Sequence, residues 1–158
     1  MQDRYKVIPR TLIFLFNNAE VLLIKHNSKN KIGFGKWNGI GGHIEEDEDP
    51  FQAAFRETRE ETGLEILKLN LEFITIIPET STYGICLFIF SGHSRIKKIV
   101  ESSEGQLMWI KIDELNTYPL MDDLQMIMNL ILKRKPMSPT KILSYVNGKK
   151  GVLIQEVG

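Results

Sequence analysis

The chain has one cysteine, no net charge and no long apolar run. Cys86 cannot form an internal disulfide, which fits a reducing compartment, and its place in the apolar run Ile85–Phe90 indicates a buried, inert thiol rather than a nucleophile. Twenty Lys and Arg balance twenty Asp and Glu, so no general attraction to nucleic acid or membrane is expected. The apolar runs fall short of the roughly 18 residues that cross a bilayer, and the N-terminus MQDRYKVIPR has no signal-peptide pattern. These absences predict a cytoplasmic protein that binds neither nucleic acid nor membrane.

The length of 158 residues allows one domain with its own core, and 42% hydrophobic content is ordinary for such a domain. No repeat or linker divides the chain, so we expect a single domain over residues 1–158. The compact basic run Lys133-Arg134-Lys135 follows a predicted helix and is expected to be solvated there, where cations complement the helix dipole. The sequence has neither heptads nor an unambiguous surface patch, so it leaves the oligomeric state open between a monomer and a homodimer.

Strands and helices are mixed along the chain in a way that predicts an α/β fold with a mixed sheet. A helix is predicted from Asp122 to Lys133, with Met126 and Leu130 in its buried stripe. The dipeptide Asn147-Gly148 separates two apolar runs and predicts a hairpin between them. The predicted strands, including the two of this hairpin, are Thr11–Phe16, Val21–Lys25, Leu69–Ile77, Tyr83–Gly92, Gln106–Ile110, Ile142–Val146 and Val152–Val157.

The most informative segment of the chain is Gly42–Leu64, which contains three glutamates at helical spacing. Glu57, Glu60 and Glu61 lie within about 100° of one helical face, because an α-helix turns once every 3.6 residues. Like charges at these spacings destabilise a bare helix by roughly 0.2–0.5 kcal/mol per pair. Mg²⁺ is commonly held by a few carboxylates together with substrate phosphates. The segment therefore predicts a site for a metal and a diphosphate.

Capping residues mark both ends of the helix that carries these glutamates. Asp49 is a good N-cap, Pro50 suits the first helical position, and Gln52 completes a capping box. Gly63 provides a left-handed end, and the glycines before the helix allow the backbone to approach a metal or phosphate closely. The glutamates are expected to stay free, because a different face offers residues for packing: Phe51, Ala54, Thr58 and Thr62.

The same segment resembles the Nudix box, G-x5-E-x7-R-E-U-x-E-E-x-G-U, in which U is aliphatic. Thr58 departs from the pattern at an aliphatic packing position, which concerns local stability more than chemistry. The resemblance implies the Nudix fold, an α/β/α sandwich with a mixed β-sheet and the Nudix loop-helix-loop, and a hydrolase of phosphorus-containing acid anhydrides. An ordinary acidic amphipathic helix is the alternative interpretation. The matching residues are Gly42, Glu48, Arg56, Glu57, Glu60, Glu61, Gly63 and Leu64.

The segment Gly35–Gly42 also resembles the one before the box in MutT-type oxidised-purine nucleoside triphosphatases. In that family the matching asparagine reads the purine edge, and a carboxamide such as that of Asn38 offers both a donor and an acceptor. Asn38 could instead be a turn residue before glycine. Asp122 and Asp123 match an aspartate pair that contacts the oxidised base in the resembling enzymes, although either could simply cap the following helix.

The resemblance implies further positions in a base pocket. Thr11 and His26 fall where the family lines that pocket, although threonine is also a good strand former and a lone histidine is usually structural. Leu120 replaces a tryptophan that stacks on the base in related enzymes, and Tyr118 is a conjectural substitute. His43 stands where relatives often have a lysine beside the phosphates, and it either contacts phosphate or faces solvent.

The reaction implied by the resemblance is hydrolysis of a nucleoside triphosphate to monophosphate and pyrophosphate, with Mg²⁺ or Mn²⁺ as cofactor. Glu57, Glu60 and Glu61 would bind metal, and the Gly42 backbone would add a ligand. The bound metal would make hydroxide available near neutral pH. A small nucleotide is thus the expected partner.

Three more residues have implied roles around this chemistry. Glu104 corresponds to a loop glutamate that approaches the metals, which makes it a candidate metal ligand or base, although neighbouring Glu101 shows that surface glutamates occur here. Either Glu57 or Glu104 would accept the proton from water. Arg56 would orient a box glutamate, and Glu48 would support the site from behind the ligands.

Other interpretations compete with this one. ADP-ribose, dinucleoside polyphosphates and undamaged dNTPs are alternative substrates, because a fold does not name a substrate. A nucleotide-sensing Nudix domain without turnover is a second class, and the intact set of glutamates argues against it. An RNA-binding module is a third, and the chain lacks the basic face and interleaved aromatics that it needs.

Overall fold

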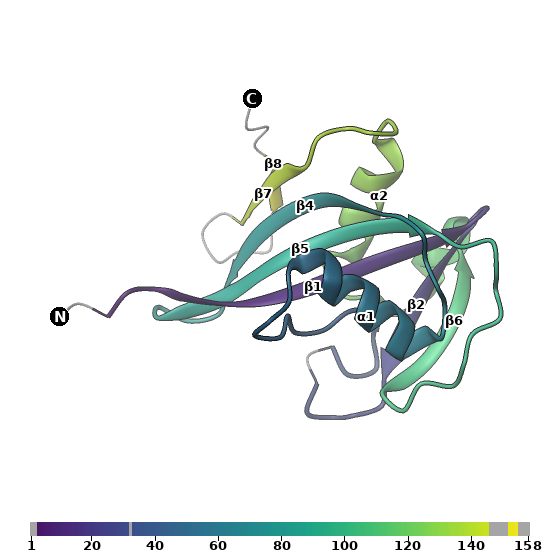
Figure 1. Ribbon diagram of the computed structural model, residues 1–158, viewed down its shortest axis with the longest axis horizontal. Coiled ribbons are helices and arrows are strands. Elements are labelled where there is room, and N and C mark those ends of the chain that lie inside the picture. The colour runs from purple at the N-terminus through teal and green to yellow at the C-terminus, as the bar shows by residue number, and fades with distance from the viewer. Residues whose placement is uncertain (1–2, 32, 146–151, 155–158) are drawn as a thin grey trace.

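The computed structural model describes residues 3–31, 33–145 and 152–154, which form a mixed eight-stranded sheet with helices on both faces (Figure 1). The helices are α1 (Pro50–Thr62), α2 (Leu124–Lys133) and a short 3-10 helix, η1 (Ile112–Thr117). The strands are β1 (Lys6–Asn17), β2 (Glu20–His26), β3 (Trp37–Asn38), β4 (Leu69–Pro78), β5 (Tyr83–His93), β6 (Gly105–Lys111), β7 (Lys141–Tyr145) and β8 (Val152–Ile154).

The sheet has the order β3-β2-β1-β5-β4-β7-β8, and β6 pairs with β2. The pairs β1–β5 and β4–β7 are parallel and the others antiparallel, which confirms the predicted mixed sheet. β1 begins earlier than predicted, at Lys6, because its first residues pair with β5 from Tyr83 onward. Strands β7 and β8 pair antiparallel as the predicted hairpin requires, and its Asn147-Gly148 turn lies outside the described residues.

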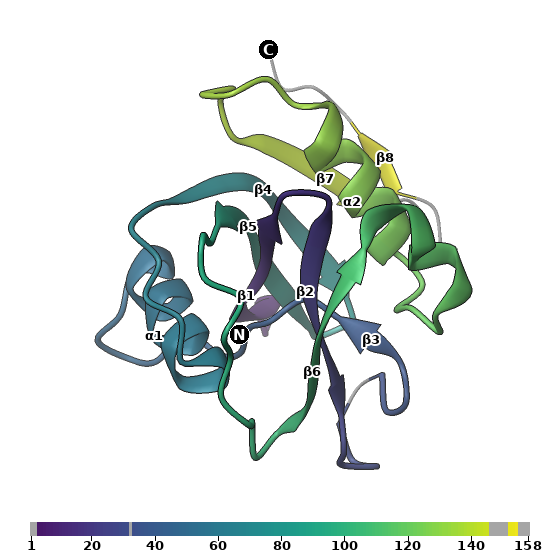
Figure 2. The ribbon, with the colours of Figure 1, turned by 90° about the vertical axis from the view of Figure 1, so that its right-hand side faces the viewer.

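The two faces of the sheet bury different side chains, because residues along a strand alternate in direction. On β1, Phe14 belongs to a core cluster with Ile127 and Met128 of α2. Leu15 belongs instead to a second cluster, with Ala54 of α1. Figures 1 and 2 show α1 and α2 on opposite sides of the sheet. This arrangement confirms the α/β/α sandwich.

The buried stripe of α2 differs from the prediction. Met126 and Leu130 are only half-buried. The helix begins at Leu124, and positions three, four and seven residues later share its face. The stripe therefore consists of Leu124, Ile127, Met128 and Ile131.

The prediction of a solvated basic run is wrong for Arg134, whose side chain is only 8% exposed. Its guanidinium pairs with the carboxylate of Glu72 on β4 and lies 5.0 Å from the ring centre of Phe73. Ser91 of β5 donates a hydrogen bond to the other oxygen of Glu72. Because a buried charge needs a partner, this ion pair ties the end of α2 to the sheet.

Two expectations from composition concern the thiol of Cys86 and membrane-spanning helices. Cys86 is half-buried, and burial raises the pKa of its thiol, as expected for an unreactive cysteine. In the described residues, no helix combines the length and apolarity that crossing a bilayer requires.

The segment before α1 lies where β1 and β2 diverge from each other. These strands pair only near their turn, between Leu15–Asn17 and Glu20–Leu22. Beyond that point the incoming chain lies against β1: the Ile13 amide donates to the Ile40 carbonyl at 2.7 Å, and the Thr11 amide donates to the Gly42 carbonyl at 2.9 Å. The glycines before α1 are thereby held against the edge of β1.

Candidate metal and nucleotide site

The ends of α1 have the predicted caps, which fix the register of its glutamates. Asp49 accepts a hydrogen bond from the Gln52 amide at 2.9 Å, and the Gln52 side chain accepts one from the Asp49 amide at 2.9 Å. Gly63 ends the helix at φ 71°, and its amide donates to the Arg59 carbonyl. Such caps typically contribute about 1 kcal/mol each.

The Thr58 departure from the box pattern is accommodated inside the helix. Thr58 is buried, and its hydroxyl donates to the Ala54 carbonyl at 2.8 Å. This bond satisfies the hydroxyl, since an unpaired buried hydroxyl would cost about 1–3 kcal/mol.

The three box glutamates differ in exposure, which corrects the expectation that all of them stay free. The side chain of Glu60 is 57% exposed and that of Glu57 only 13%. Glu61 is 4% exposed, because it shares the buried arc of α1 with Ala54 and Thr58. Among the described residues, neither of its carboxylate oxygens has a well-formed hydrogen bond, although the Gly41 backbone approaches the carboxyl and lowers its pKa.

Burial dominates the electrostatics of the two inner glutamates. It raises the pKa of Glu61 to about 8, and the negative charges of Glu57 and Glu104 contribute to the same rise. Burial also raises the pKa of Glu57, against the lowering effect of Arg56. Glu104 influences both groups, so the fold brings this β5–β6 loop residue close to the box glutamates.

Two glycines are required where the chain enters the site. A Cβ on Gly42 would overlap the carboxylate of Glu57, so only glycine lets the backbone lie there. Gly41 has φ +146°, and a Cβ on it would overlap the Thr11 carbonyl. The Thr11 hydroxyl accepts a hydrogen bond from the Gly42 amide at 3.4 Å. Thr11 thus lies against the glycine turn.

Arg56 organises the carboxylates around it. Its Nε and Nη2 donate to the two oxygens of Glu48 at 2.6 and 2.8 Å. Its Nη1 donates to Glu57 at 2.9 Å and to Glu60 at 3.1 Å, and Nη2 also donates to the His43 carbonyl at 3.1 Å. All five guanidinium donors are therefore engaged. Arg56 in turn lowers the pKa of Glu48.

The carboxylate set fits a hard cation in its chemistry. In the part of the chain that the structure describes, no three His, Cys, Asp or Glu side chains already converge on one point, and Arg56 holds Glu57 and Glu60. Glu61, however, presents two buried oxygens that have no well-formed hydrogen bond within the described ranges, and a buried carboxylate in such a place is costly. A divalent cation would supply the missing positive charge.

Glu104 and His26 meet at the ends of β2 and β6. The Asn27 amide donates to the Glu104 carbonyl at 3.2 Å, and the Glu104 carboxylate pairs with Lys31. His26 has a buried Nδ1 without a partner, and burial together with the charge of Lys31 lowers its pKa.

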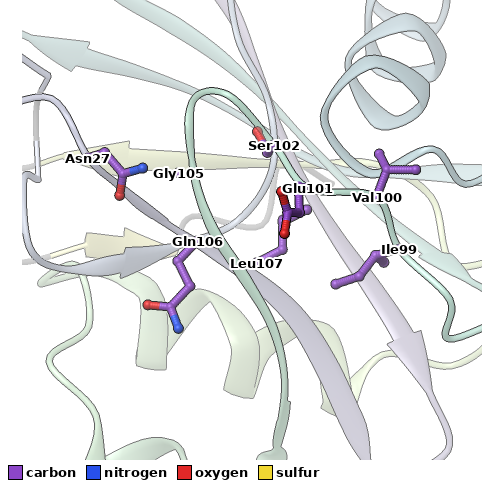
Figure 3. Close-up of a pocket in the computed structure, with 8 residues that line it drawn as sticks. All are labelled: Asn27, Ile99, Val100, Glu101, Ser102, Gly105, Gln106 and Leu107. Atoms are coloured by element: carbon purple, nitrogen blue, oxygen red, sulfur yellow. The ribbon is translucent and has the colours of Figure 1, made fainter.

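A pocket of about 380 Å³ borders this end of the site (Figure 3). Val100 and Leu107 line it together with the polar side chains of Asn27 and Gln106, on either side of the loop that carries Glu104. The Val100 amide donates to the carbonyl of Thr62 at 3.0 Å, so the pocket lies at the end of α1. Its size is in the range of small-ligand pockets.

The predicted base-reading residues lie on segments that pair with each other. The Trp37 amide donates to the Pro119 carbonyl at 2.8 Å, and the Met121 amide donates to the Trp37 carbonyl at 3.0 Å. Lys36 pairs with Asp122 at 2.7 Å, which joins the segment before Asn38 to the aspartate pair. The fold thus brings together two stretches that are far apart along the chain.

The local contacts of the predicted base-pocket residues can be compared with the simpler roles of turn, helix cap and core residue. Asn38 accepts a hydrogen bond from the Gly39 amide at 2.8 Å, but it lies in β3 and pairs with Ile24 of β2, so it is not a turn residue. Asp123 occupies the N-cap position of α2 but makes no side-chain capping bond. Tyr118 packs edge to face on Trp37 at 6.2 Å, and half-buried Leu120 packs against the core. His43 is exposed.

Sequence reasoning missed two lysines that contact the site. Lys31 pairs with Glu104, and Lys36 pairs with Asp122. Both belong to the polar, lysine-bearing loop between β2 and β3, and this composition was the available signal. The partners are far along the chain, so no local pattern identifies them.

Residues 6–129 match the NUDIX domain. The oxidized purine nucleoside triphosphate hydrolase of Danio rerio is 33% identical over 129 residues, which cover 79% of this chain and 80% of that protein. The protein of the same name from Mus musculus is 30% identical over 126 residues, with the same coverage of 79% and 80%.

Solved structures share the fold. The MutT protein of Bacillus halodurans has a TM-score of 0.69 at 24% identity, over 88% of this chain and 90% of that one. The NUDIX domain of Shewanella oneidensis NrtR, solved with ADP ribose, has a TM-score of 0.67 at 16% identity, over 85% and 90%. Together with the domain match and the relatives, they confirm the resemblance seen in the sequence: the chain belongs to the NUDIX domain family and is a hydrolase of phosphorus-containing acid anhydrides.

Proposed function

We propose that this protein is a Mg²⁺-dependent nucleoside triphosphate pyrophosphohydrolase that acts on oxidised purine dNTPs, such as 8-oxo-dGTP. The products are the nucleoside monophosphate and pyrophosphate. The observation that carries the metal chemistry is the buried carboxylate of Glu61, which no side chain of the described residues pairs and which the negative charges of Glu57 and Glu104 influence. The names of the two relatives, at 33% and 30% identity, support the substrate class.

Glu57, Glu60 and Glu61 would hold the metal, the loop residue Glu104 would be a further ligand or the base, and the Gly42 backbone would add a ligand. When bound, Mg²⁺ or Mn²⁺ neutralises phosphate charge and lowers the pKa of water. Because Gly42 has no Cβ, the Glu57 carboxylate can lie against the backbone there, while the Gly42 carbonyl already accepts one hydrogen bond from the Thr11 amide.

The surrounding residues position these ligands and handle the proton. Arg56 orients Glu57 and Glu60 through one nitrogen, Nη1, and Glu48 fixes the guanidinium with two hydrogen bonds. Glu57 or Glu104 accepts the proton from the attacking water.

The base would be read at the other end of the site. Asn38 and the Asp122–Asp123 pair would read the base there. Thr11, against the Gly42 turn, and His26, beside Glu104, would line the pocket nearer to the metal ligands. The ion pair of Lys36 with Asp122 supports the assignment, because it connects the segment of Asn38 to the aspartates. Leu120 packs against the core, so it offers an apolar surface to the base in place of an aromatic ring.

The test is a substrate panel of 8-oxo-dGTP, dGTP, dATP, ADP-ribose and diadenosine polyphosphate, each with Mg²⁺. We expect the highest kcat/KM with 8-oxo-dGTP, and loss of at least about 100-fold in Glu60→Gln and Glu61→Gln because carboxylate ligands become neutral amides. Exposed Glu65→Gln, just beyond α1, is the matched control and should retain wild-type activity.

The panel separates the competing substrates. Preference for ADP-ribose, the molecule bound to the NrtR domain, would keep the metal site and reject the base-pocket assignment. Tight binding of one compound without turnover of any would reject the proposed catalysis.

A further inference from the structure

The Lys31–Glu104 ion pair joins two loops at the edge of the carboxylate cluster. Lys31 lies in the β2–β3 loop, where its amide donates to the Ser28 carbonyl at 3.1 Å and its own carbonyl accepts from the Phe34 amide at 3.2 Å. Glu104 lies in the β5–β6 loop, 73 residues away. The two side chains are 41% and 45% exposed, so water and ions reach the pair.

The ammonium group of Lys31 also influences the inner carboxylates. Its charge lowers the pKa of Glu61, whereas the charge of Glu104 raises the pKa of both Glu61 and Glu57. Lys31 therefore lies within electrostatic reach of the candidate metal ligands, on the side of Glu104.

We propose that Lys31 is a polyphosphate-binding residue whose ammonium group exchanges the Glu104 carboxylate for the phosphate tail of the substrate. This inference rests on the proposed function, in which a metal-bound polyphosphate lies beside Glu104. Glu104 approaches the metal in that function, so the metal and the Lys31 ammonium group would compete for the Glu104 carboxylate oxygens. The polyphosphate offers the displaced ammonium several anionic oxygens.

Arg56, which also contacts the box glutamates, cannot take this role. Arg56 uses all five of its donors on Glu48, Glu57, Glu60 and the His43 carbonyl. Lysine carries three donors on a flexible four-carbon stem, so rotation of the side chain is enough to change its partner.

The strengths of the two contacts favour the exchange. An exposed ion pair typically contributes at most about a five-fold change in equilibrium constant. A charge-assisted hydrogen bond to phosphate contributes about ten-fold or more. The Glu104 partner is thus easily released, and the phosphate partner is the stronger one.

Lys31→Ala tests this exchange with two calorimetric titrations of the full chain. In the first, Mg²⁺ alone is added, and we expect about two- to five-fold tighter binding, because the competing ammonium is gone. In the second, inorganic triphosphate is added at saturating Mg²⁺, and we expect at least about ten-fold weaker binding. Lys31→Arg should restore part of the triphosphate affinity.

Lys29→Ala is the matched control, since Lys29 is an exposed lysine of the same loop, and it should change neither titration. A merely structural role of Lys31 would weaken both ligands, and that result would overturn the proposal. Unchanged triphosphate affinity in Lys31→Ala would overturn it as well. Neither titration uses a nucleoside, so a wrong base assignment would appear in the substrate panel and leave these results intact.

Discussion

Replacing Glu61 with Gln is expected to stabilise the metal-free protein while removing its activity. Burial raises the pKa of Glu61 from 4.5 to about 8. Between these pH values the folded state holds a proton that the unfolded state has lost, so the free energy of unfolding falls as pH rises from 4.5 to 8. A difference of one in pKa between the folded and unfolded states corresponds to about 1.4 kcal/mol, so the full cost above pH 8 is up to about 5 kcal/mol. Gln is neutral at every pH and avoids this cost.

Thermal unfolding in EDTA at pH 5 and pH 9 measures the effect. For a chain of this size, 1 kcal/mol shifts Tm by about 2–4 °C, so Glu61→Gln should melt several degrees above the wild type at pH 9. At pH 5 the two should melt within about 2 °C of each other, because the wild-type carboxyl is then protonated. Millimolar Mg²⁺ should raise the Tm of the wild type and leave the variant nearly unchanged.

Exposed Glu65→Gln is the control and should match the wild type at both pH values. Equal stabilisation of Glu61→Gln at pH 5 and pH 9 would show that the gain does not come from a buried charge. A lower Tm at pH 9 would refute the reasoning outright.

Three further substitutions test other parts of the site. Arg56→Lys replaces a five-donor fork with a point charge, so kcat should fall roughly 10- to 100-fold in steady-state assays. Gly41→Ala forces a Cβ against the Thr11 carbonyl at φ +146°, and urea unfolding should show a loss of about 2 kcal/mol or more. Lys36→Met removes the exposed pair with Asp122; stability should change by less than about 1 kcal/mol, while the preference for 8-oxo-dGTP over dATP should fall about five-fold.

The features that could be predicted from the sequence depend on neighbouring residues. The capping box of Asp49 and Gln52 and the left-handed Gly63 follow from residues within one helical turn of each end. The continuous apolar run Thr11–Phe16 likewise indicates a buried strand, whereas the first residues of β1, from Lys6, are extended because they pair with β5.

The features that were missed depend on tertiary contacts. Helical spacing places Glu61 on the same face as Glu57. The packing of α1 against the sheet then decides that the Glu61 side of this face is buried. Arg134 is buried because Glu72, 62 residues away, lies under the end of α2. Lys36 likewise meets a partner 86 residues away, so a local motif could not reveal its contact.

The most direct test of the account is the product analysis of 8-oxo-dGTP hydrolysis in Mg²⁺, in EDTA and with Glu61→Gln, by ion-exchange chromatography. We predict monophosphate and pyrophosphate in equal amounts from the wild type in Mg²⁺, and no products in EDTA or from the variant. Release of the nucleoside diphosphate and inorganic phosphate would contradict the assignment as a pyrophosphohydrolase. Turnover that persists in EDTA or in Glu61→Gln would contradict the assignment of this carboxylate cluster as the metal site.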